Sequence, residues 1–251
     1  MPSLHIVMHK LVSYPISFLY YITFVLILSV FDPIQRICYY FFGYEAHKRS
    51  VSILNFFLVR NTHLLGTTYD FQNREKLPNG VPLIIVANHQ SLYDIIPIIW
   101  FMRKWHPKFI SKKELGKGIP SVSYNLRHGG SVLIDRKNPK QAIPEIKKMG
   151  EYIEKNNRSA VIFPEGTRSK NGEPKPFAES GLKILCKYAP SAYIVPVTIN
   201  NSWKVLRYGK FPLGLGNQLE FIFHEPMAVK GSDFEELFKK TEQTVINALN
   251  N

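Results

Sequence analysis

Cysteine is scarce in this chain, which has two, Cys38 and Cys186. They lie far apart, each in an apolar stretch, so they form neither a metal-ligand spacing nor a disulfide framework. Buried, reduced thiols are the ordinary state of such residues. We therefore predict two free cysteines and a reducing compartment that faces the cytosol.

Carboxylates are also in short supply. Aspartate and glutamate number 19 against 32 lysines and arginines, which gives a formal net charge of +13. A surplus of this size predicts attraction to nucleic acid, anionic lipid headgroups or phosphorylated substrates. The sequence has no internal repeat and no low-complexity segment. Its 251 residues, 45% of them hydrophobic, suit one large domain with a short extension.

Charge is absent altogether from residues 11–31 (LVSYPISFLYYITFVLILSVF). An apolar run of about 20 residues is long enough to cross a bilayer as a helix. We expect a break at Asp32-Pro33, followed by further apolar and aromatic stretches at 34–44 and 51–58. Aromatic rings mixed with cations are typical of helices at a membrane surface.

Three interpretations of this segment compete. A signal peptide lacks its small-residue cleavage site, and a core helix of this length is less expected than membrane contact. Whether the segment spans the bilayer or lies in one leaflet stays open. Basic residues after the run place the rest of the chain on the cytoplasmic side, at the inner membrane if the cell is bacterial; they are Arg36, Lys48, Arg49 and Arg60. We predict membrane-binding helices over residues 1–60 and an α/β domain over 61–251.

Short, wholly apolar runs recur from about Leu77 onward, as strands buried on both faces do. The predicted strands are 82–87, 108–110, 131–134, 160–163, 193–199 and 219–223, and the predicted helices are 92–104, 140–155, 178–188 and 232–249. This alternation predicts an α/β fold with a largely parallel sheet flanked by helices. In such folds ligands bind in the loops after the carboxyl ends of the strands.

The first of these loops contains His89 and Asp94. Histidine is well suited to accept a proton near neutral pH, and a carboxylate bound to its other nitrogen fixes the tautomer. On one regular helix the two side chains would diverge. They can meet if His89 precedes the helix and Ser91 caps it, which puts Asp94 in the first turn. A structural histidine beside a capping aspartate would give the same pattern.

A second loop reads FPEGTRS over residues 163–169 and again follows a predicted buried strand. Gly166 allows the backbone to approach a ligand, and Thr167 and Ser169 supply hydroxyl groups. Arg168 supplies a planar fork that matches a phosphate group. A tight turn with charged neighbours is the alternative interpretation.

Together the two loops resemble the glycerolipid acyltransferase family, specifically the 1-acyl-sn-glycerol-3-phosphate acyltransferases. Three further segments are similar to that family's motifs and occur in the family's order: 111–115 ahead of Pro120, 130–136 and 194–198. The resemblance covers roughly residues 75 to 200. It implies a glycerol-3-phosphate acyltransferase-like fold with an apolar N-terminal helical segment that binds membranes.

The resemblance also implies roles for individual residues. His89 would be the general base and Asp94 would orient it. Residues that bind the acceptor's phosphate, or position those that do, would be Arg168, Glu165, Gly166, Thr167, Lys112 and Arg136. The acceptor hydroxyl would attack an acyl thioester of acyl-carrier protein or coenzyme A directly, with no acyl-enzyme, no metal and no other cofactor. The expected product from lysophosphatidate is phosphatidate, for phospholipid synthesis.

Other functions remain open at this point. The acceptor could be another lysolipid, such as a lyso-amino-acid lipid. A non-catalytic basic protein at the membrane surface is a second alternative, whereas nucleic-acid binding is disfavoured because the aromatics concentrate in the N-terminal apolar segments. A metal-dependent hydrolase would need further spaced ligands. Residues 121–128 (SVSYNLRH) depart from the family's aromatic and glycine-rich pattern, so acyl-chain preference is not predicted.

Overall fold

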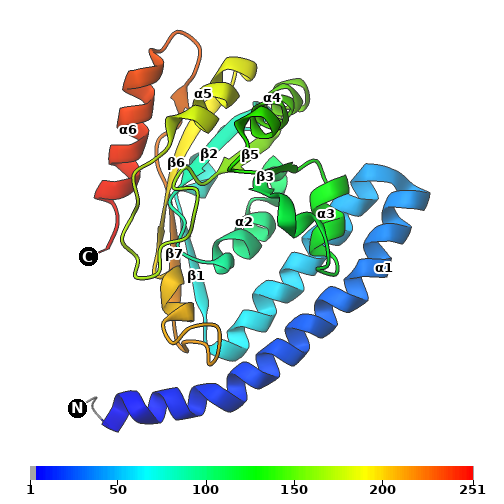
Figure 1. Cartoon of the computed structure of the whole chain (residues 1–251), viewed down its shortest axis with the longest axis vertical. Coiled ribbons are helices and arrows are strands. Elements are labelled where there is room, and N and C mark those ends of the chain that lie inside the picture. The colour runs from blue at the N-terminus through cyan, green and yellow to red at the C-terminus, as the bar shows by residue number, and fades with distance from the viewer. Residues whose placement is uncertain (1–3, 251) are drawn as a thin grey trace.

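A mixed sheet forms the centre of the molecule in the computed structural model, which describes residues 4–250 (Figure 1). Its strands are β1 (Thr68–Gln72), β2 (Leu83–Ala87), β3 (Pro107–Lys112), β4 (Val132–Ile134), β5 (Ser159–Ile162), β6 (Tyr193–Asn200), β7 (Gln218–Phe223) and β8 (Met227–Ala228). The order is β1-β7-β6-β2-β5-β3-β4, with β8 also paired to β6. Only β6 with β7 and β6 with β8 pair antiparallel. The predicted largely parallel α/β fold is confirmed.

Helices cover both faces of this sheet (Figure 1). They are α1 (Leu4–Thr62), α2 (Ile95–Phe101), α3 (Val122–His128), α4 (Pro139–Asn156), α5 (Glu179–Tyr188) and α6 (Phe234–Asn247). The helices α4, α5 and α6 lie on one side, and α1, α2 and α3 lie on the other (Figure 1). The sequence prediction missed β1, β8 and α3. It also predicted one helix over residues 92–104, whereas α2 is shorter and is flanked at each end by a single 3-10 turn.

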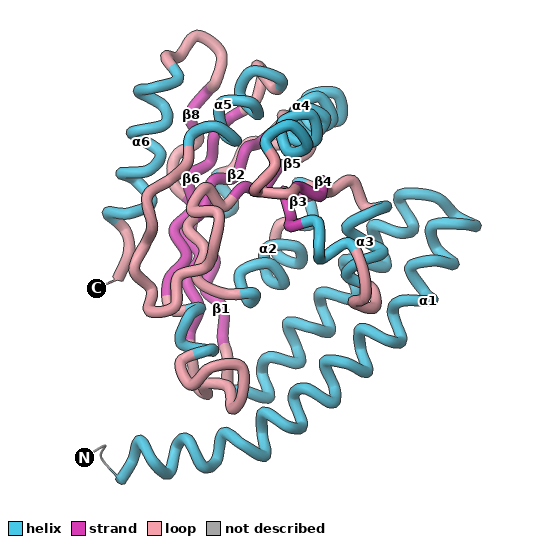
Figure 2. Tube along the Cα trace, in the orientation of Figure 1, coloured by secondary structure: helices cyan, strands magenta, loops and turns pink. Residues whose placement is uncertain are grey.

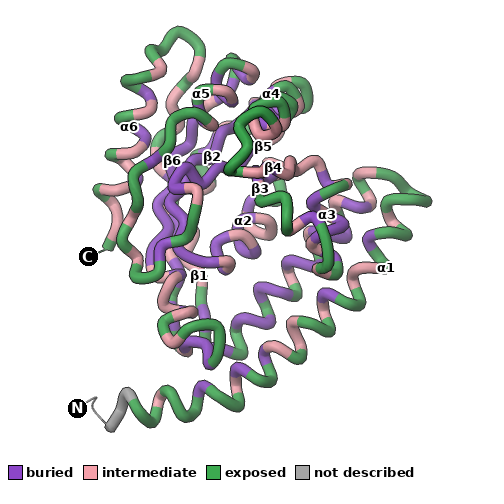
Figure 3. Tube along the Cα trace, in the orientation of Figure 1, coloured by how far each residue is buried: buried purple, intermediate pink, exposed green. Residues whose placement is uncertain are grey.

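The central strands are apolar on both faces, as their sequences predict. In β2, Leu83, Ile85 and Ala87 join the core on the α1–α2 side. The alternate residues Ile84 and Val86 join the core under α4, α5 and α6. Figure 3 shows the strands at the middle of the sheet as a continuous buried layer. This rigid layer positions the loops at its carboxyl edge.

The N-terminal helix does not break at Asp32-Pro33, so that prediction is wrong. It continues to Gly43, whose backbone (φ 76, ψ −166) is non-helical and reverses the chain. Two limbs, residues 4–42 and 44–62, run side by side as a hairpin (Figure 2). The part of α1 just before Pro33 is held by Ser121, the residue that precedes α3. Ser121 donates its N–H to Asp32 and its hydroxyl to the Leu28 carbonyl. These contacts attach α1 to the α/β domain just before Pro33, where the helix continues without the proline N–H.

The first limb packs on the domain through buried serines and through apolar residues such as Tyr20 and Leu28, and it also presents apolar side chains outward. Ser13 and Ser17 are fully buried, and the Ser17 hydroxyl accepts a hydrogen bond from the N–H of Leu213. Phe18 and Leu11, by contrast, are 63% and 62% exposed. By length and composition α1 is the one described helix that could cross a membrane. Its inner face, however, is occupied by the α/β domain. Both cysteines are free, and Cys38 is half-buried rather than buried.

Candidate active site

Four parallel strands deliver the predicted site residues to one edge of the sheet. His89 follows β2, Glu165 follows β5, Lys112 ends β3 and Arg136 follows β4. These strands are neighbours in the order β2-β5-β3-β4 and run in the same direction. The carboxyl ends of parallel strands meet at one edge, so residues far apart in sequence converge there.

His89 and Asp94 contact each other directly. The distance from His89 Nδ1 to Asp94 Oδ2 is 2.7 Å. Ser91 caps the turn that follows, since its hydroxyl accepts the N–H of Tyr93, and Asp94 occupies the third position of that turn. The predicted arrangement of a loop histidine and a first-turn aspartate is therefore present.

The Asp94 carboxylate is completely buried, yet it is fully hydrogen-bonded. Besides the imidazole, its Oδ2 accepts the backbone N–H groups of Gln90 (2.8 Å) and Ser91 (3.0 Å). Its other oxygen, Oδ1, accepts the hydroxyl of Ser202. Several donors to one carboxylate stabilise its ionised form. An ionised carboxylate can only accept, which places the ring hydrogen of His89 on Nδ1 and leaves Nε2 as the basic nitrogen.

The imidazole of His89 is held in place from a second direction. It stacks on Phe163 with a centroid separation of 4.1 Å and an interplanar angle of 18°. The residue as a whole is 8% exposed. A ring that is fixed by stacking and by Asp94 keeps its Nε2 aimed in one direction, as a positioned proton acceptor must be.

Glu165 joins the two motif loops. Its Oε1 accepts the backbone N–H of His89 at 2.8 Å, and its Oε2 accepts that of Lys175 at 3.1 Å. In return the N–H of Ser169 donates to the carbonyl of His89 at 2.8 Å. Glu165 thus holds the backbone of both loops in place.

Other predicted site residues lie nearer the surface than His89 and Glu165 do. Arg168, Thr167 and Lys112 are exposed. Arg136 donates to the carbonyl of Gly166, whose left-handed backbone (φ 69) favours glycine. Burial and the neighbouring Arg168 guanidinium lower the pKa of Arg136. Guanidinium groups that lie close together are a type of donor that phosphate groups bind in proteins.

Three polar residues that support the dyad escaped the sequence analysis. Ser202 binds Asp94, and its own N–H donates to the Gln90 side chain at 3.0 Å. Asn88 exchanges two hydrogen bonds with the backbone of Ile199, at 2.7 and 2.8 Å. Asn88 and Gln90 flank the histidine in the sequence, which is a signal that was available. Ser202 has no such signal, because only the fold brings β6 beside β2.

The family model named Acyltransferase matches residues 68–200, which is more than half of the chain. The chain belongs to the acyltransferase family. In the part of this acyltransferase that the structure describes, no three His, Cys, Asp or Glu side chains gather as a metal site.

Several relatives share a more specific name. The 1-acyl-sn-glycerol-3-phosphate acyltransferase BAT2, chloroplastic, of Brassica napus is 29% identical over 182 residues, covering 72% of this chain and 51% of that protein. The 1-acyl-sn-glycerol-3-phosphate acyltransferase of Helicobacter pylori is 40% identical over 125 residues, 49% of this chain and 50% of that protein. The chain thus spans about half the length of these relatives.

A solved structure matches nearly the whole chain. The crystal structure of the 1-acyl-sn-glycerophosphate acyltransferase PlsC from Thermotoga maritima superposes with a TM-score of 0.76 at 25% identity, covering 95% of each chain. The resemblance stated from the motifs, and the fold that it implied, are confirmed.

Glu165 gives this acyltransferase a measurable dependence of stability on pH. Burial raises its pKa to about 7, although the N–H groups of His89 and Lys175 oppose the shift. The folded state therefore binds a proton that the unfolded state releases between about pH 4.5 and 7. Its contribution to stability is present below that range and is lost as the pH rises through it.

We expect Glu165→Gln to remove this dependence. From pH 5 to pH 7.5 the variant should gain about 2 kcal/mol in free energy of unfolding relative to wild type. Urea unfolding at a series of pH values measures the difference between the two proteins. A difference that stays constant across that range would contradict the raised pKa.

Proposed function

We propose that this protein transfers a fatty acyl group from an acyl thioester to the sn-2 hydroxyl of lysophosphatidate, giving phosphatidate. The observation that carries the proposal is the 2.7 Å contact between His89 and Asp94, which leaves Nε2 as the base beside the FPEGTRS loop. The names of the relatives and of the structural neighbour support the same acceptor.

The reaction needs one proton shuttle and no covalent enzyme intermediate. Nε2 of His89 takes the proton of the acceptor hydroxyl while its oxygen attacks the thioester carbonyl carbon. The tetrahedral intermediate then collapses, the C–S bond breaks, and the leaving thiolate takes the proton back from the imidazolium. Asp94 stabilises that imidazolium through Nδ1, as a buried carboxylate does in related dyads.

We place the acceptor's phosphate at the rim formed by Arg168, Arg136 and Lys112. Arg168 and Lys112 are exposed, and Arg136 and Arg168 lie close enough to lower the pKa of Arg136. A phosphate would relieve that repulsion. Thr167 adds a hydroxyl donor, and Glu165 keeps this loop in register with His89.

The exposed face of α1 is the proposed membrane contact. Its first limb lies along the domain, where Tyr21 donates its hydroxyl to the Lys210 carbonyl. A helix docked in this way lies in one leaflet rather than across the bilayer. The aromatic run Tyr40–Phe42 at the hairpin tip is 69% to 82% exposed. Arg36 and Lys48 nearby favour an anionic, cytoplasmic leaflet.

The central test is an acyl-transfer assay of the purified chain with a panel of lysolipids and both acyl-carrier protein and coenzyme A thioesters. We expect phosphatidate from lysophosphatidate. His89→Ala should lower turnover by about 10² to 10⁴. Lipid mass spectrometry gives the product. The matched control is His63→Ala, which removes an exposed histidine away from the carboxyl edge. Turnover near wild type in a folded His89→Ala protein would eliminate the mechanism.

Arg168→Lys tests the phosphate site separately. Lysine keeps the charge but loses the planar fork, so the apparent KM for lysophosphatidate should rise at least about tenfold while kcat changes little. Monoacylglycerol, which has no phosphate, is the comparison acceptor. It should be an equally poor acceptor for wild type and for Arg168→Lys. An unchanged KM for lysophosphatidate would place the phosphate elsewhere.

Membrane binding is tested at the hairpin tip. Changing Tyr40, Phe41 and Phe42 to serine removes exposed rings that each contribute on the order of 2 kcal/mol when buried in lipid. Vesicle co-sedimentation should weaken at least about tenfold, while activity in detergent micelles persists. Ile143→Ser, at an exposed apolar position on α4, is the control. Equal vesicle binding by both variants would reject α1 as the anchor.

A further inference from the structure

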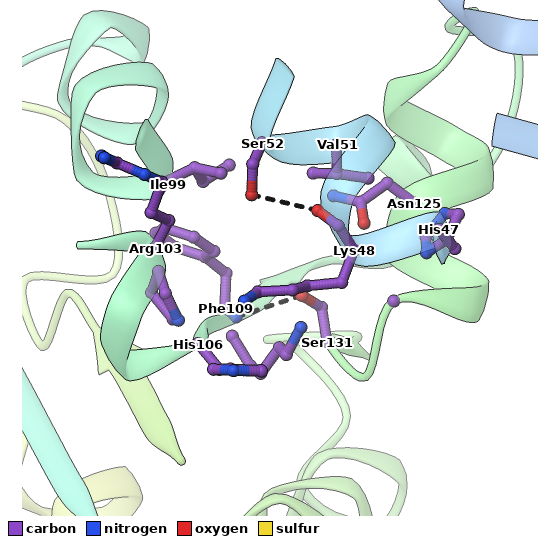
Figure 4. Close-up of a pocket in the computed structure, with 13 residues that line it drawn as sticks. His47, Lys48, Val51, Ser52, Ile99, Arg103, His106, Phe109, Asn125 and Ser131 are labelled. Atoms are coloured by element: carbon purple, nitrogen blue, oxygen red, sulfur yellow. Dashed lines mark hydrogen bonds between the residues drawn. The ribbon is translucent and has the colours of Figure 1, made fainter. Parts of the chain in front are cut away.

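A second cluster of basic side chains surrounds a cavity on the α1 side of the sheet (Figure 4). The cavity lies between the second limb of α1, the end of α2, the start of β3 and the end of α3. Five of the 13 lining residues are basic, and none is acidic; the five are His47, Lys48, Arg103, His106 and Lys108. We call this pocket the basic cavity, after these five side chains.

The positive charge of the basic cavity is not neutralised by the protein. Among residues 4–250, Lys48, Arg103 and Lys108 form no ion pair with a carboxylate. The neighbouring carboxylate, Glu45, is 3.5 Å from Arg158 and is paired there. Figure 4 shows Lys48 extending across the cavity from α1, with Arg103 and His106 on the opposite wall.

Lys108 is the most constrained of these cations. It is 7% exposed, and its ammonium group lies 5.1 Å from the centroid of the Tyr44 ring, with no carboxylate paired to it among residues 4–250. A buried ammonium without a counter-ion costs several kcal/mol. Burial, together with the charges of Arg158 and Lys48, lowers its pKa to about 7 even though Glu45 acts in the opposite direction.

Two histidines that line the cavity from opposite walls also have ring nitrogens without hydrogen-bond partners. His47 is fully buried with neither ring nitrogen paired, and the Nδ1 of His106 is buried and unpaired. Burial lowers the pKa of both to about 4, so each is a neutral imidazole with one N–H to donate. Unpaired buried donors are rare in folded proteins, and an ordered water or a bound anion is the usual partner of such a group.

The basic cavity is separate from the candidate active site. Lys108 pairs with Ala160, which pairs with Ile84, so the three residues lie level across the sheet. His89 comes five residues after Ile84 in the strand direction. At about 3.3 Å per residue the two sites are roughly 16 Å apart along the sheet.

We infer that the basic cavity binds a phosphate group, held by the Arg103 fork, the ammonium groups of Lys48 and Lys108, and a histidine N–H. Such a group can belong to an anionic lipid headgroup or to a free phosphate compound. Tyr44, whose ring covers Lys108, directly follows the turn at Gly43. The cavity therefore lies just behind the proposed membrane-contacting tip, within reach of headgroups.

Histidine-labelled NMR of the full chain in uncharged detergent tests this site. Titrated phosphate, and sulfate as an anion without a pKa near neutrality, should shift the signals of His47 and His106 saturably. His89 reports on the acceptor site in the same titration. Lys108→Met should weaken the anion response of His47 and His106 at least about tenfold and leave the response of His89 unchanged. It should also raise Tm in anion-free buffer, because a buried charge is removed.

Lys104→Met is the matched control, since Lys104 is an exposed lysine four residues away that does not line the cavity. It should keep the wild-type response within about twofold. Arg103→Gln, at an exposed position, is a second variant that preserves the core. The proposal fails if wild type gives no saturable shift of His47 and His106, or if Lys108→Met and Arg103→Gln both titrate like wild type.

Nanodiscs distinguish the two sources of the phosphate group. If the ligand is a headgroup, phosphatidylglycerol nanodiscs should reproduce the shifts of His47 and His106, phosphatidylcholine nanodiscs should not, and Lys108→Met should abolish the difference. If the ligand is a free phosphate compound, both kinds of nanodisc should leave the soluble-anion titration of wild type unchanged. Either result supports a phosphate site at Lys108.

Discussion

The buried carboxylate of Asp94 is the constraint on which the site depends. A fully buried charge is tolerated only when its lone pairs are satisfied, and Asp94 collects an imidazole, two backbone N–H groups and the Ser202 hydroxyl. These donors come from the loop after β2 and from the turn after β6. Satisfying one carboxylate therefore fixes the loop, the helix that starts in it and the ring of His89 together.

The two motif loops depend on each other through their backbones. His89 donates its N–H to Glu165, and its carbonyl accepts the N–H of Ser169. One of these hydrogen bonds uses the Glu165 side chain and the other joins two backbones, and together they tie the loop after β2 to the loop after β5. It gives a physical reason why the two sequence motifs occur together: each loop supplies hydrogen-bond partners that the other one needs.

Much of this arrangement could be predicted from the sequence. Strands buried on both faces, such as β2, leave continuous apolar runs, and the spacing from His89 to Asp94 admits contact only in the geometry observed. Ser202 could not be found, because its link to Asp94 depends on which strands are neighbours. The hairpin of α1 was missed for another reason. Because residues 11–31 carry no charge, their sequence does not show which side of the helix faces the domain. The chain reversal depends on the non-helical backbone of Gly43.

The helix α1 differs from an ordinary surface helix because it is apolar on both sides, with Tyr20 and Leu28 buried against the protein and Leu11 and Phe18 facing outward. With the proposed membrane contact, water surrounds the α/β domain and lipid hydrocarbon covers the outer side of α1. In water without lipid or detergent, the exposed apolar side chains of α1 stay in contact with water. The same side of α1 in a second copy of the chain is a surface that would cover them. We therefore expect the association state of the purified protein to change with the detergent or lipid that is supplied with it.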